Sequence, residues 1–479
     1  MPPPMAEQPL FRKILIANRG EIALRVLRAC HDLGVPAVVA YSDADRESLA
    51  VQLADEAVCI GPAPVSKSYN NIPAIISAAL VTGCDALHPG YGFLAENAYL
   101  ADICQQVGVT FIGPRPEVIE RMGNKAEARR VMRDAGVPLV PGSDGPVENL
   151  GAARQAARKI GYPVMIKAVA GGGGRGMRLA RDEIELTRLL PLAQTEAEAA
   201  FGDGAVYLER AIERPRHVEV QILADQHGAT LAVGDRDCSI QRRHQKLVEE
   251  APAPNLPRRT RENLLKAAVK GAKAVHYTNA GTLEFLLDRD DRFYFMEMNT
   301  RIQVEHPVTE LATGIDLVAW QIRIAAGQRL VVSERDVEPH GHAIECRITA
   351  EDALADFAPG VGTVGAYIAP GGPGVRLDSH LYAGYAVPPY YDSLLAKLIV
   401  WGRDRGEAVA RMERALTELA IAGVPNTAAY LRQVIADEAF RQADVHTGFL
   451  QEHGDRILAA VAASGAGRPG EREPRQDDR

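Results

Sequence analysis

Two acidic residues are spaced so that a β-hairpin would bring them face to face. The apolar run Gly281–Leu287 contains Glu284, and the run Arg292–Asn299, which alternates polar and apolar residues, contains Glu297. The four residues between the runs include three aspartates, which is typical of a turn. If residue 289 pairs with residue 292, counting outward along both strands places Glu284 opposite Glu297.

Opposed carboxylates on a sheet repel each other unless a cation lies between them. Side-chain alternation puts Asn299 on the same face as Glu284 and Glu297, and Mg²⁺ takes oxygen ligands together with phosphates. The alternative is an acidic face in solvent. The apolar stretch 293–296 would occupy both faces of the hairpin, however, and this indicates a covered sheet. The pattern therefore favours a divalent-cation site.

A second polar cluster, Thr300–Pro307, follows at once and holds Arg301, Gln303 and Glu305 within five residues. A guanidinium clamps a small planar oxyanion through two hydrogen bonds. A carboxylate beside it can serve as a general base. Bicarbonate, a carboxylate and a carbamate all fit this description, and the residue types do not choose among them.

A glycine-rich segment, Gly171–Gly176, lies between two predicted strands, Tyr162–Ala170 and Met177–Ala180. Walker and Rossmann loops open directly into a helix, so this loop belongs to neither class. It suits a hairpin that closes over phosphates and donates backbone N–H groups to them. A flexible linker is the alternative, and the flanking Lys167 and Arg175 favour phosphate.

Other polar residues carry little information when taken singly. A lone histidine is more often structural than a ligand, a lysine at a helix start is ordinary on a surface, and Cys238 has no partner at metal-ligand spacing. The residues in this group are His217, Gln241, His244, Lys246 and Lys125.

The elements that must position these residues fall into three regions and a tail. Residues 10–122 alternate short apolar runs with amphipathic stretches, which predicts an α/β domain with a parallel sheet covered by helices. Residues 123–340 hold the polar motifs, and residues 341–455 return to strands and helices. Residues 456–479, almost without apolar side chains from about Ser464, are predicted to be a disordered tail.

Composition limits the function classes further. The chain has 479 residues and a formal net charge of −8, which argues against nucleic-acid binding. It has no signal-peptide pattern at its start and no apolar run of the roughly 18 residues that a membrane span needs. The six cysteines are scattered, as expected for reduced thiols, so we expect a cytoplasmic protein without a membrane anchor.

Several long motifs resemble the biotin carboxylases, a family of ATP-grasp ligases. The similar stretches span roughly residues 11–450 and include ANRGEIALR, HPGYGFLAEN, GGGGRGMR, RDCSIQRRHQKLVEEAPAP, FMEMNTRIQVEHPVTE, GHAIECRI and YYDSLLAKL. The resemblance implies an α/β (α+β) fold: an N-terminal doubly wound parallel-sheet domain, a central ATP-grasp domain whose glycine-loop lid covers about 138–211, and a C-terminal mixed α/β domain.

The resemblance also implies a role for each site residue. ATP phosphates would contact Lys125, Lys167 and the loop Gly171, Gly172, Gly173 and Gly174, and adenosine would contact Glu209, His217, Gln241 and His244. Mg²⁺ or Mn²⁺ would bind Glu284, Glu297 and Asn299. Bicarbonate would bind Arg301, Gln303 and Val304, with Glu305 as base and Lys246 near the transferred phosphoryl group. Biotin would lie near Tyr91, and Arg347 would stabilise its enolate.

The implied reaction is the ATP- and bicarbonate-dependent carboxylation of biotin through carboxyphosphate. The sequence contains no Met-Lys-Met, the family's biotin-attachment motif, so we expect a separate biotin carboxyl carrier protein and carboxyltransferase subunits as partners, and a homodimer by analogy. Acetyl-CoA carboxylase is the expected assembly, with propionyl-CoA, other acyl-CoA or pyruvate carboxylases as alternatives. A different ATP-grasp ligase and a regulatory protein without catalysis are the other hypotheses.

The sequence departs from the family's pattern in small ways. Arg210 stands where relatives often carry lysine, and the turn between Glu284 and Glu297 is longer than in some relatives. The tail has no counterpart. These differences put fine nucleotide contacts in doubt and leave the expected reaction unchanged.

Overall fold

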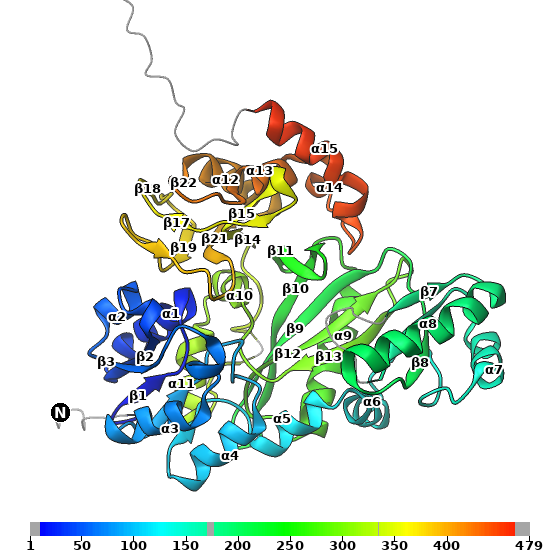
Figure 1. Cartoon of the computed structure of the whole chain (residues 1–479), viewed down its shortest axis with the longest axis horizontal. Coiled ribbons are helices and arrows are strands. Elements are labelled where there is room, and N and C mark those ends of the chain that lie inside the picture. The colour runs from blue at the N-terminus through cyan, green and yellow to red at the C-terminus, as the bar shows by residue number, and fades with distance from the viewer. Residues whose placement is uncertain (1–9, 170–176, 334, 465–479) are drawn as a thin grey trace, which may run out of the picture.

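The computed structural model describes residues 10–169, 177–333 and 335–464. Its N-terminal region is a five-stranded sheet of order β3-β2-β1-β4-β5 in which every pair is parallel, with helices packed around it (Figure 1). This confirms the predicted parallel-sheet domain. The elements are β1 (Ile14–Ile16), α1 (Gly20–Asp32), β2 (Ala37–Ser42), α2 (Leu49–Leu53), β3 (Glu56–Gly61), α3 (Ile72–Val81), β4 (Ala86–His88), α4 (Ala98–Gln106), β5 (Thr110–Phe111) and α5 (Pro116–Gly123).

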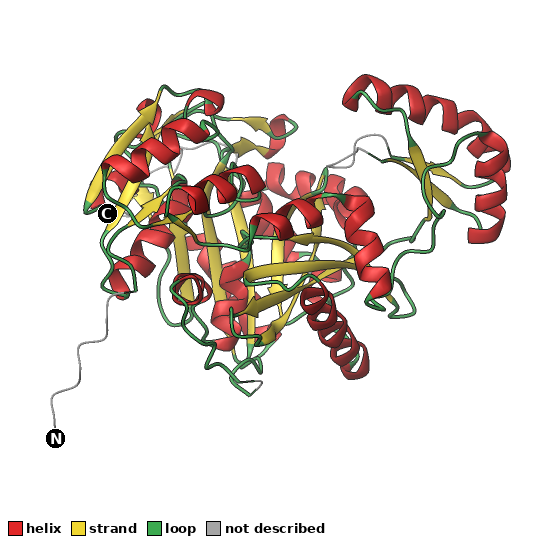
Figure 2. Ribbon diagram, turned by 90° about the horizontal axis from the view of Figure 1, so that it is seen from below, coloured by secondary structure: helices red, strands yellow, loops and turns green. Residues whose placement is uncertain are grey.

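A small unit built on three strands stands apart from the rest of the molecule (Figure 2). Its strand order is β7-β6-β8, and it has an apolar core of its own. Asn149 and Asp182 start its two helices by accepting a backbone N–H with the side chain. The elements, with the preceding α6 (Lys125–Asp134), are α7 (Leu150–Ile160), β6 (Val164–Ala168), β7 (Arg178–Ala180), α8 (Glu183–Phe201) and β8 (Val206–Arg210).

An eight-stranded antiparallel sheet, of order β13-β12-β9-β10-β11-β14-β21-β19, runs through the remaining two regions. The pairing of β11 with β14 makes it continuous across the position where the sequence motifs suggested a boundary. Its strands are β9 (Arg216–Ala224), β10 (Thr230–Arg242), β11 (Gln245–Ala251), β12 (Asn279–Leu287), β13 (Phe293–Asn299), β14 (His342–Thr349), β19 (Val375–Ser379) and β21 (Leu394–Gly402).

Helices and short strands complete these regions. The helices are α9 (Arg258–Ala274), α10 (His306–Thr313), α11 (Leu317–Ala325), α12 (Arg405–Glu418), α13 (Ala428–Ala436), α14 (Glu438–Arg441) and α15 (Phe449–Ala463). The short strands are β15 (Glu351–Asp352), β16 (Ala358–Pro359), β17 (Gly362–Thr363), β18 (Tyr367–Ile368), β20 (Ala386–Val387) and β22 (Ala420–Ile421). In the three described ranges, no helix combines the length and the apolar character needed to cross a bilayer.

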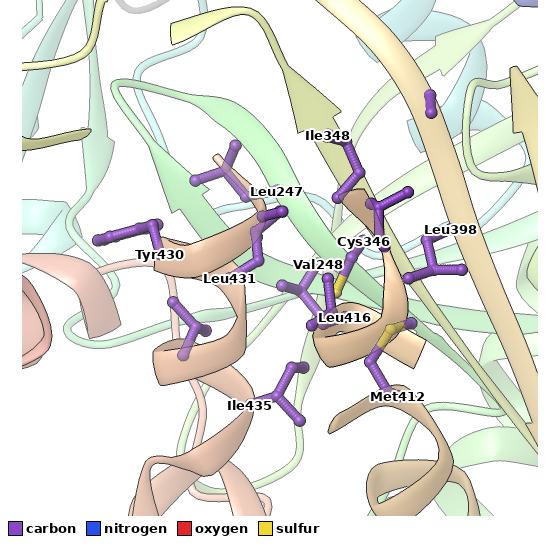
Figure 3. Close-up of a cluster of buried hydrophobic side chains, with 14 of the residues drawn as sticks. Leu247, Val248, Cys346, Ile348, Leu398, Met412, Leu416, Tyr430, Leu431 and Ile435 are labelled. Carbon is purple, nitrogen blue, oxygen red and sulfur yellow. The ribbon is translucent and has the colours of Figure 1, made fainter. Parts of the chain in front are cut away.

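The C-terminal end of the large sheet has two chemically opposite faces. Val248, Cys346 and Leu398 are direct cross-strand neighbours on β11, β14 and β21, and they pack against helices of the C-terminal region in one apolar core (Figure 3). Because side chains alternate along a strand, the intervening residues point to the other face, beneath α10. That face carries charged residues beside a small apolar cluster packed against α10, and it leads into the functional site.

Two predictions about local structure are wrong. Residue 289 does not pair with 292, because the Asp288 carboxylate accepts the N–H groups of Asp290 and Arg292 and widens the turn by one residue. A bulge between the Glu284 and Phe285 pairings then restores the register, so that the predicted Glu284–Glu297 pair is confirmed.

The assignment of residues 456–463 to a disordered tail is also wrong. These residues continue α15, since Ile457 and Val461 are buried in the C-terminal core. Residues 465–479 lie outside the described part of the chain, as do Gly171–Gly174 of the predicted phosphate loop.

Candidate functional site

A row of charged side chains crosses four strands of the large sheet. Glu297 pairs with Glu284, Glu284 with Glu219, and Glu219 with Arg236, so that all four point to one face. Arg236 is fully buried and donates to Glu219 at 2.5 Å. The row is therefore acidic at the β13 end and neutralised at the β10 end.

Glu284 is held from several sides by polar groups. Its Oε1 accepts hydrogen bonds from the side-chain amides of Asn299 and Gln303, both at 2.9 Å, and its Oε2 lies 3.0 Å from His217 Nε2. Burial alone would raise the pKa of Glu284, but Lys246 and His217 outweigh it and hold the pKa well below its usual value. Glu284 is thus a fixed anion.

Glu297 faces the opposite situation. Burial and the charge of Glu284 both raise the pKa of Glu297. Like charges directly opposite on a sheet are costly, and a divalent cation held by Glu284, Glu297 and Asn299 would remove that cost. The oxygen-rich donor set therefore fits Mg²⁺ or Mn²⁺. Lys125, the first residue of α6, is exposed, and its charge also acts on Glu297.

Lys246 forms ion pairs with three carboxylates of the site. Its Nζ lies 2.7 Å from Glu219, 2.9 Å from Glu284 and 2.6 Å from Glu305. Burial would lower the pKa of Lys246, but the three carboxylates prevail and raise it well above its usual value. A single ammonium ion thus connects the acidic row to Glu305.

Glu305 is completely buried between two cations. Its other oxygen accepts from Arg347 at 2.9 Å, and Arg347 also contacts Glu249 on the neighbouring strand at 2.5 Å. Burial would raise the pKa of Glu305, but Lys246 and Arg347 hold it well below the usual value. The carboxylate is therefore ionised and ready to accept a proton once a cation moves away.

Arg301 lies beside this carboxylate with its guanidinium oriented by three partners. It donates to Glu96 Oε2 at 2.9 Å, to Gln303 Oε1 at 2.8 Å and to Asn299 Oδ1 at 3.0 Å. A guanidinium held on several sides loses little entropy when it binds an oxyanion. The structure thus brings Arg301, Gln303 and Glu305 together on one loop, next to the proposed metal ligands.

A second group of predicted residues is divided between β8 of the small three-stranded unit and β10 of the large sheet. Glu209, on β8, is buried and accepts from Lys167 Nζ at 2.5 Å and from Arg129. Gln241 on β10 is hydrogen-bonded to His217 Nδ1 at 2.7 Å.

His244, also predicted to contact adenosine, is exposed on the β10–β11 turn at a positive φ of 65°. No hydrogen bond or ion pair to it is found among the residues that the structure describes.

Tyr91 reaches the site from the N-terminal sheet. The Asn18 side chain donates to the carbonyls of Pro89 and Tyr91, both at 2.7 Å, and so fixes the loop that carries the tyrosine. The Tyr91 hydroxyl donates to the buried Glu21. Burial and Glu21 together raise the pKa of Tyr91 well above its usual value, so the phenol stays protonated.

Sequence reasoning missed four residues that support the site: Glu96, Glu219, Arg236 and Glu249. Glu219 could have been predicted from the sequence, because it lies two residues after His217 and therefore points to the same strand face. Glu96 and Glu249 lie far from their partners in sequence, so no local pattern identifies them.

The chain matches three protein-family models in succession. They are described as biotin carboxylase, N-terminal domain (residues 10–119), carbamoyl-phosphate synthase L chain, ATP binding domain (residues 124–333), and biotin carboxylase C-terminal domain (residues 345–452).

Relatives are similar over nearly their whole length. A biotin carboxylase of Nostoc sp. is 58% identical, over 92% of this chain and 99% of the relative. The biotin carboxylase domain dimer of Hydrogenobacter thermophilus 2-oxoglutarate carboxylase, solved with MgADP, ADP and bicarbonate, is 50% identical, with a TM-score of 0.88 over 94% of this chain and 98% of that one. A solved biotin carboxylase component of pyruvate carboxylase is also 50% identical, with a TM-score of 0.83 over 94% of this chain and 99% of that one.

Proposed function

The chain belongs to the biotin carboxylase family of ATP-dependent carboxylase ligases, and we propose that it carboxylates biotin on a separate carrier protein with ATP and bicarbonate. The observation that carries the proposal is the buried Glu305, held between Lys246 and Arg347 on the loop that also presents Arg301. This arrangement joins an oxyanion clamp, a base and two cations at one point. Bicarbonate is the substrate that uses all of them.

Two sets of residues would hold the nucleotide and its metal. Glu284, Glu297 and Asn299 would bind Mg²⁺ or Mn²⁺, which offsets charge on the transferred phosphoryl group. Lys125, Lys167, Glu209, His217, Gln241, His244 and the loop Gly171–Gly174 would bind ATP. The dense bonding of Glu284 supports the first set, because a metal ligand must be held in place before the ion arrives.

Lys246 would couple the nucleotide to the base. One ammonium ion cannot bond three carboxylates and a phosphate together, since it has three protons to donate. When Lys246 turns toward the phosphate, Glu305 loses its nearest cation and its basicity rises. Arg301, Gln303 and the backbone at Val304 would hold bicarbonate while Glu305 takes its proton. The bicarbonate oxygen then attacks the γ-phosphorus of ATP, the bond to the β–γ bridging oxygen breaks, and carboxyphosphate and ADP result.

Arg347 would act in the second half of the reaction. Carboxyphosphate breaks down to CO₂ and phosphate inside the closed site, and the phosphate takes the N1′ proton of biotin. The biotin enolate that results carries negative charge, and Arg347, already in the site through Glu305, is placed to stabilise it. Tyr91 would pack near the ring.

The wider setting follows the relatives. We propose that the assembly served is acetyl-CoA carboxylase, because relatives named biotin carboxylase predominate among the most similar proteins. A pyruvate carboxylase is the alternative, favoured by the solved pyruvate carboxylase component. The biotin carrier and carboxyltransferase would be the partners.

Three further features belong to the proposal. A homodimer is supported by the dimeric Hydrogenobacter domain. Work in the cytoplasm is supported by six cysteines that are all free thiols. The division at 10–122, 123–340 (lid about 138–211) and 341–455 is proposed for the functional regions.

The test is ADP release by the purified protein with Mg²⁺, with and without bicarbonate and free biotin. Bicarbonate-dependent release that biotin stimulates is expected. A rate of ADP release that does not change with biotin, whether free or attached to a carrier, would point to another ATP-grasp ligase. For the acceptor, a conditional depletion strain rescued by fatty acids would support acetyl-CoA carboxylase, and rescue by oxaloacetate-derived nutrients would point to pyruvate carboxylase.

A further inference from the structure

A fully buried lysine, Lys397 on β21, lies behind the loop that carries Arg301, Gln303 and Glu305. It takes no part in the chemistry described above. Its side chain is 0% exposed. Its Nζ lies 3.0 Å from Glu21 Oε1 on α1 and donates to the Val304 carbonyl at 2.9 Å. Burying an ammonium ion is costly unless it is paired and hydrogen-bonded, and an apolar side chain would fill the same space without that cost.

The hydrogen bond from Lys397 to the Val304 carbonyl holds the peptide group that joins Val304 to Glu305, the proposed base. The Val304 carbonyl and the Glu305 N–H belong to the same rigid plane. Holding the carbonyl therefore fixes the N–Cα bond of Glu305 and narrows the directions in which its side chain can leave the backbone. It also fixes the Val304 backbone, next to which bicarbonate is proposed to bind.

The start of α10 lacks the support that helix starts usually have. Glu305 is its N-cap residue, and its side chain makes no capping hydrogen bond. That carboxylate is instead committed to Lys246 and Arg347. Lys397 does not satisfy the free N–H groups of this first turn, where Pro307 has none to offer, but it anchors the carbonyl of the residue just before the N-cap.

Lys397 and Arg347 are direct cross-strand partners on β21 and β14, so both point to the same sheet face. Arg347 bonds the Glu305 carboxylate, and Lys397 bonds the backbone one peptide away. Like charges directly opposite on a sheet repel each other. Their placement is offset by Glu249 beside Arg347, and by Glu21 and the cross-strand Asp378 beside Lys397.

We propose that Lys397 is a positioning residue, which holds the Val304–Glu305 peptide so that bicarbonate and the base meet in the reactive geometry. The Glu21–Lys397 pair also links this peptide to Tyr91, whose hydroxyl donates to the same Glu21 oxygen. Movement of the N-terminal sheet would therefore shift the Val304–Glu305 peptide at the proposed bicarbonate site. This positioning role rests on the proposed function. Lys397 itself has no part in the reaction scheme.

The experiment compares Lys397→Met with the wild-type enzyme in steady-state ADP release. A lost hydrogen bond from a charged group corresponds to roughly a 10- to 100-fold fall in kcat/KM for bicarbonate. The KM for ATP should change less than about twofold, because the nucleotide residues lie on other strands. The matched control is Arg405→Met, since Arg405 also bonds a buried carboxylate, that of Glu250, and a backbone carbonyl, but away from the loop.

Arg405→Met is expected to lower the melting temperature and leave the KM for bicarbonate unchanged. If Lys397→Met does not fold, Lys397→Met with Glu21→Gln removes both buried charges and takes its place. Equal losses of kcat/KM toward bicarbonate and ATP, or an unchanged kcat/KM for bicarbonate in a folded variant, would overturn the positioning role. A wild-type protein without bicarbonate-dependent activity would instead sink the proposed function, so the two failures are distinguishable.

Discussion

The two faces of β11, β14 and β21 differ in character although the same three strands build both, since one is an apolar core and the other combines charged pairs with a small apolar cluster against α10. One face carries Val248, Cys346 and Leu398 in an apolar core. The other carries Glu249 opposite Glu345, and Arg347 opposite Lys397. A shift of one residue along each strand thus separates side chains that stabilise the fold from side chains that can do chemistry.

The charged face is stable because nearly every charge on it has a partner. Arg347 bonds Glu249 and Glu305, and Lys397 bonds Glu21. Glu345 is the exception, since both its oxygens are buried without a hydrogen-bond partner among the described residues. Substitutions on the apolar face should therefore lower stability, and substitutions on the charged face should mainly lower activity.

The largest expected effect is that of Glu305→Gln. Removing a general base lowers turnover by roughly 10²- to 10⁴-fold. The amide keeps the size of the side chain, and ATP affinity, measured by equilibrium binding, should stay within about twofold. Turnover close to that of the wild type would remove Glu305 as the base.

On the apolar face, Leu398→Ala should lower the free energy of unfolding by about 2–5 kcal/mol, because Leu398 is fully buried and leaves a cavity. The KM values of the folded fraction should be unchanged. Denaturant titration and steady-state kinetics measure the two quantities. Leu398→Met, which conserves volume, is the control and should cost less than about 1.5 kcal/mol. A selective rise in the KM for bicarbonate would show that the two faces are not separable.

At the metal site, Glu297→Gln should raise the Mg²⁺ concentration for half-maximal activity about tenfold, since outer and inner ligands each contribute on that scale. Titration of activity with MgCl₂ at saturating ATP measures this. The exposed Glu418 on α12, changed to Gln, is the control. Unaltered Mg²⁺ dependence in Glu297→Gln would exclude it as a ligand.

The smallest effect concerns pH. Burial raises the pKa of Glu345 well above its usual value, against the opposing charge of Lys397. A carboxyl group with a raised pKa in the fold contributes fully below its unfolded pKa of about 4.5, and the contribution is lost as pH rises toward the folded pKa. Glu345→Gln, which cannot ionise, should therefore become more stable relative to the wild type as the pH is raised from 5 to 8. Thermal unfolding at both pH values measures the difference, and a gain that does not depend on pH would contradict the raised pKa.

Local patterns in the sequence predict a large part of this protein. Strand–helix alternation predicted the parallel N-terminal sheet, and period-two alternation predicted the Glu284–Glu297 pair. The pair was correct although its turn was not, because the wider turn at Asp288 and the bulge cancel each other. Residues 456–463 were assigned wrongly because the boundary of the tail was placed before the apolar run Ile457–Ala463, in which Ile457 and Val461 have the spacing of one helix face.

What the sequence alone determined was the set of groups proposed to react, since Arg301, Gln303 and Glu305 lie within five residues and need no folding to be neighbours. What only the tertiary structure decided was their electrostatic state. Lys246, Arg347 and Lys397 come from three strands that are distant in sequence, and burial makes their charges act strongly over a few ångströms. The order of the residues determines which groups are neighbours along the chain. Which groups are neighbours across a sheet depends on the pairing of strands, and that pairing depends on the whole core.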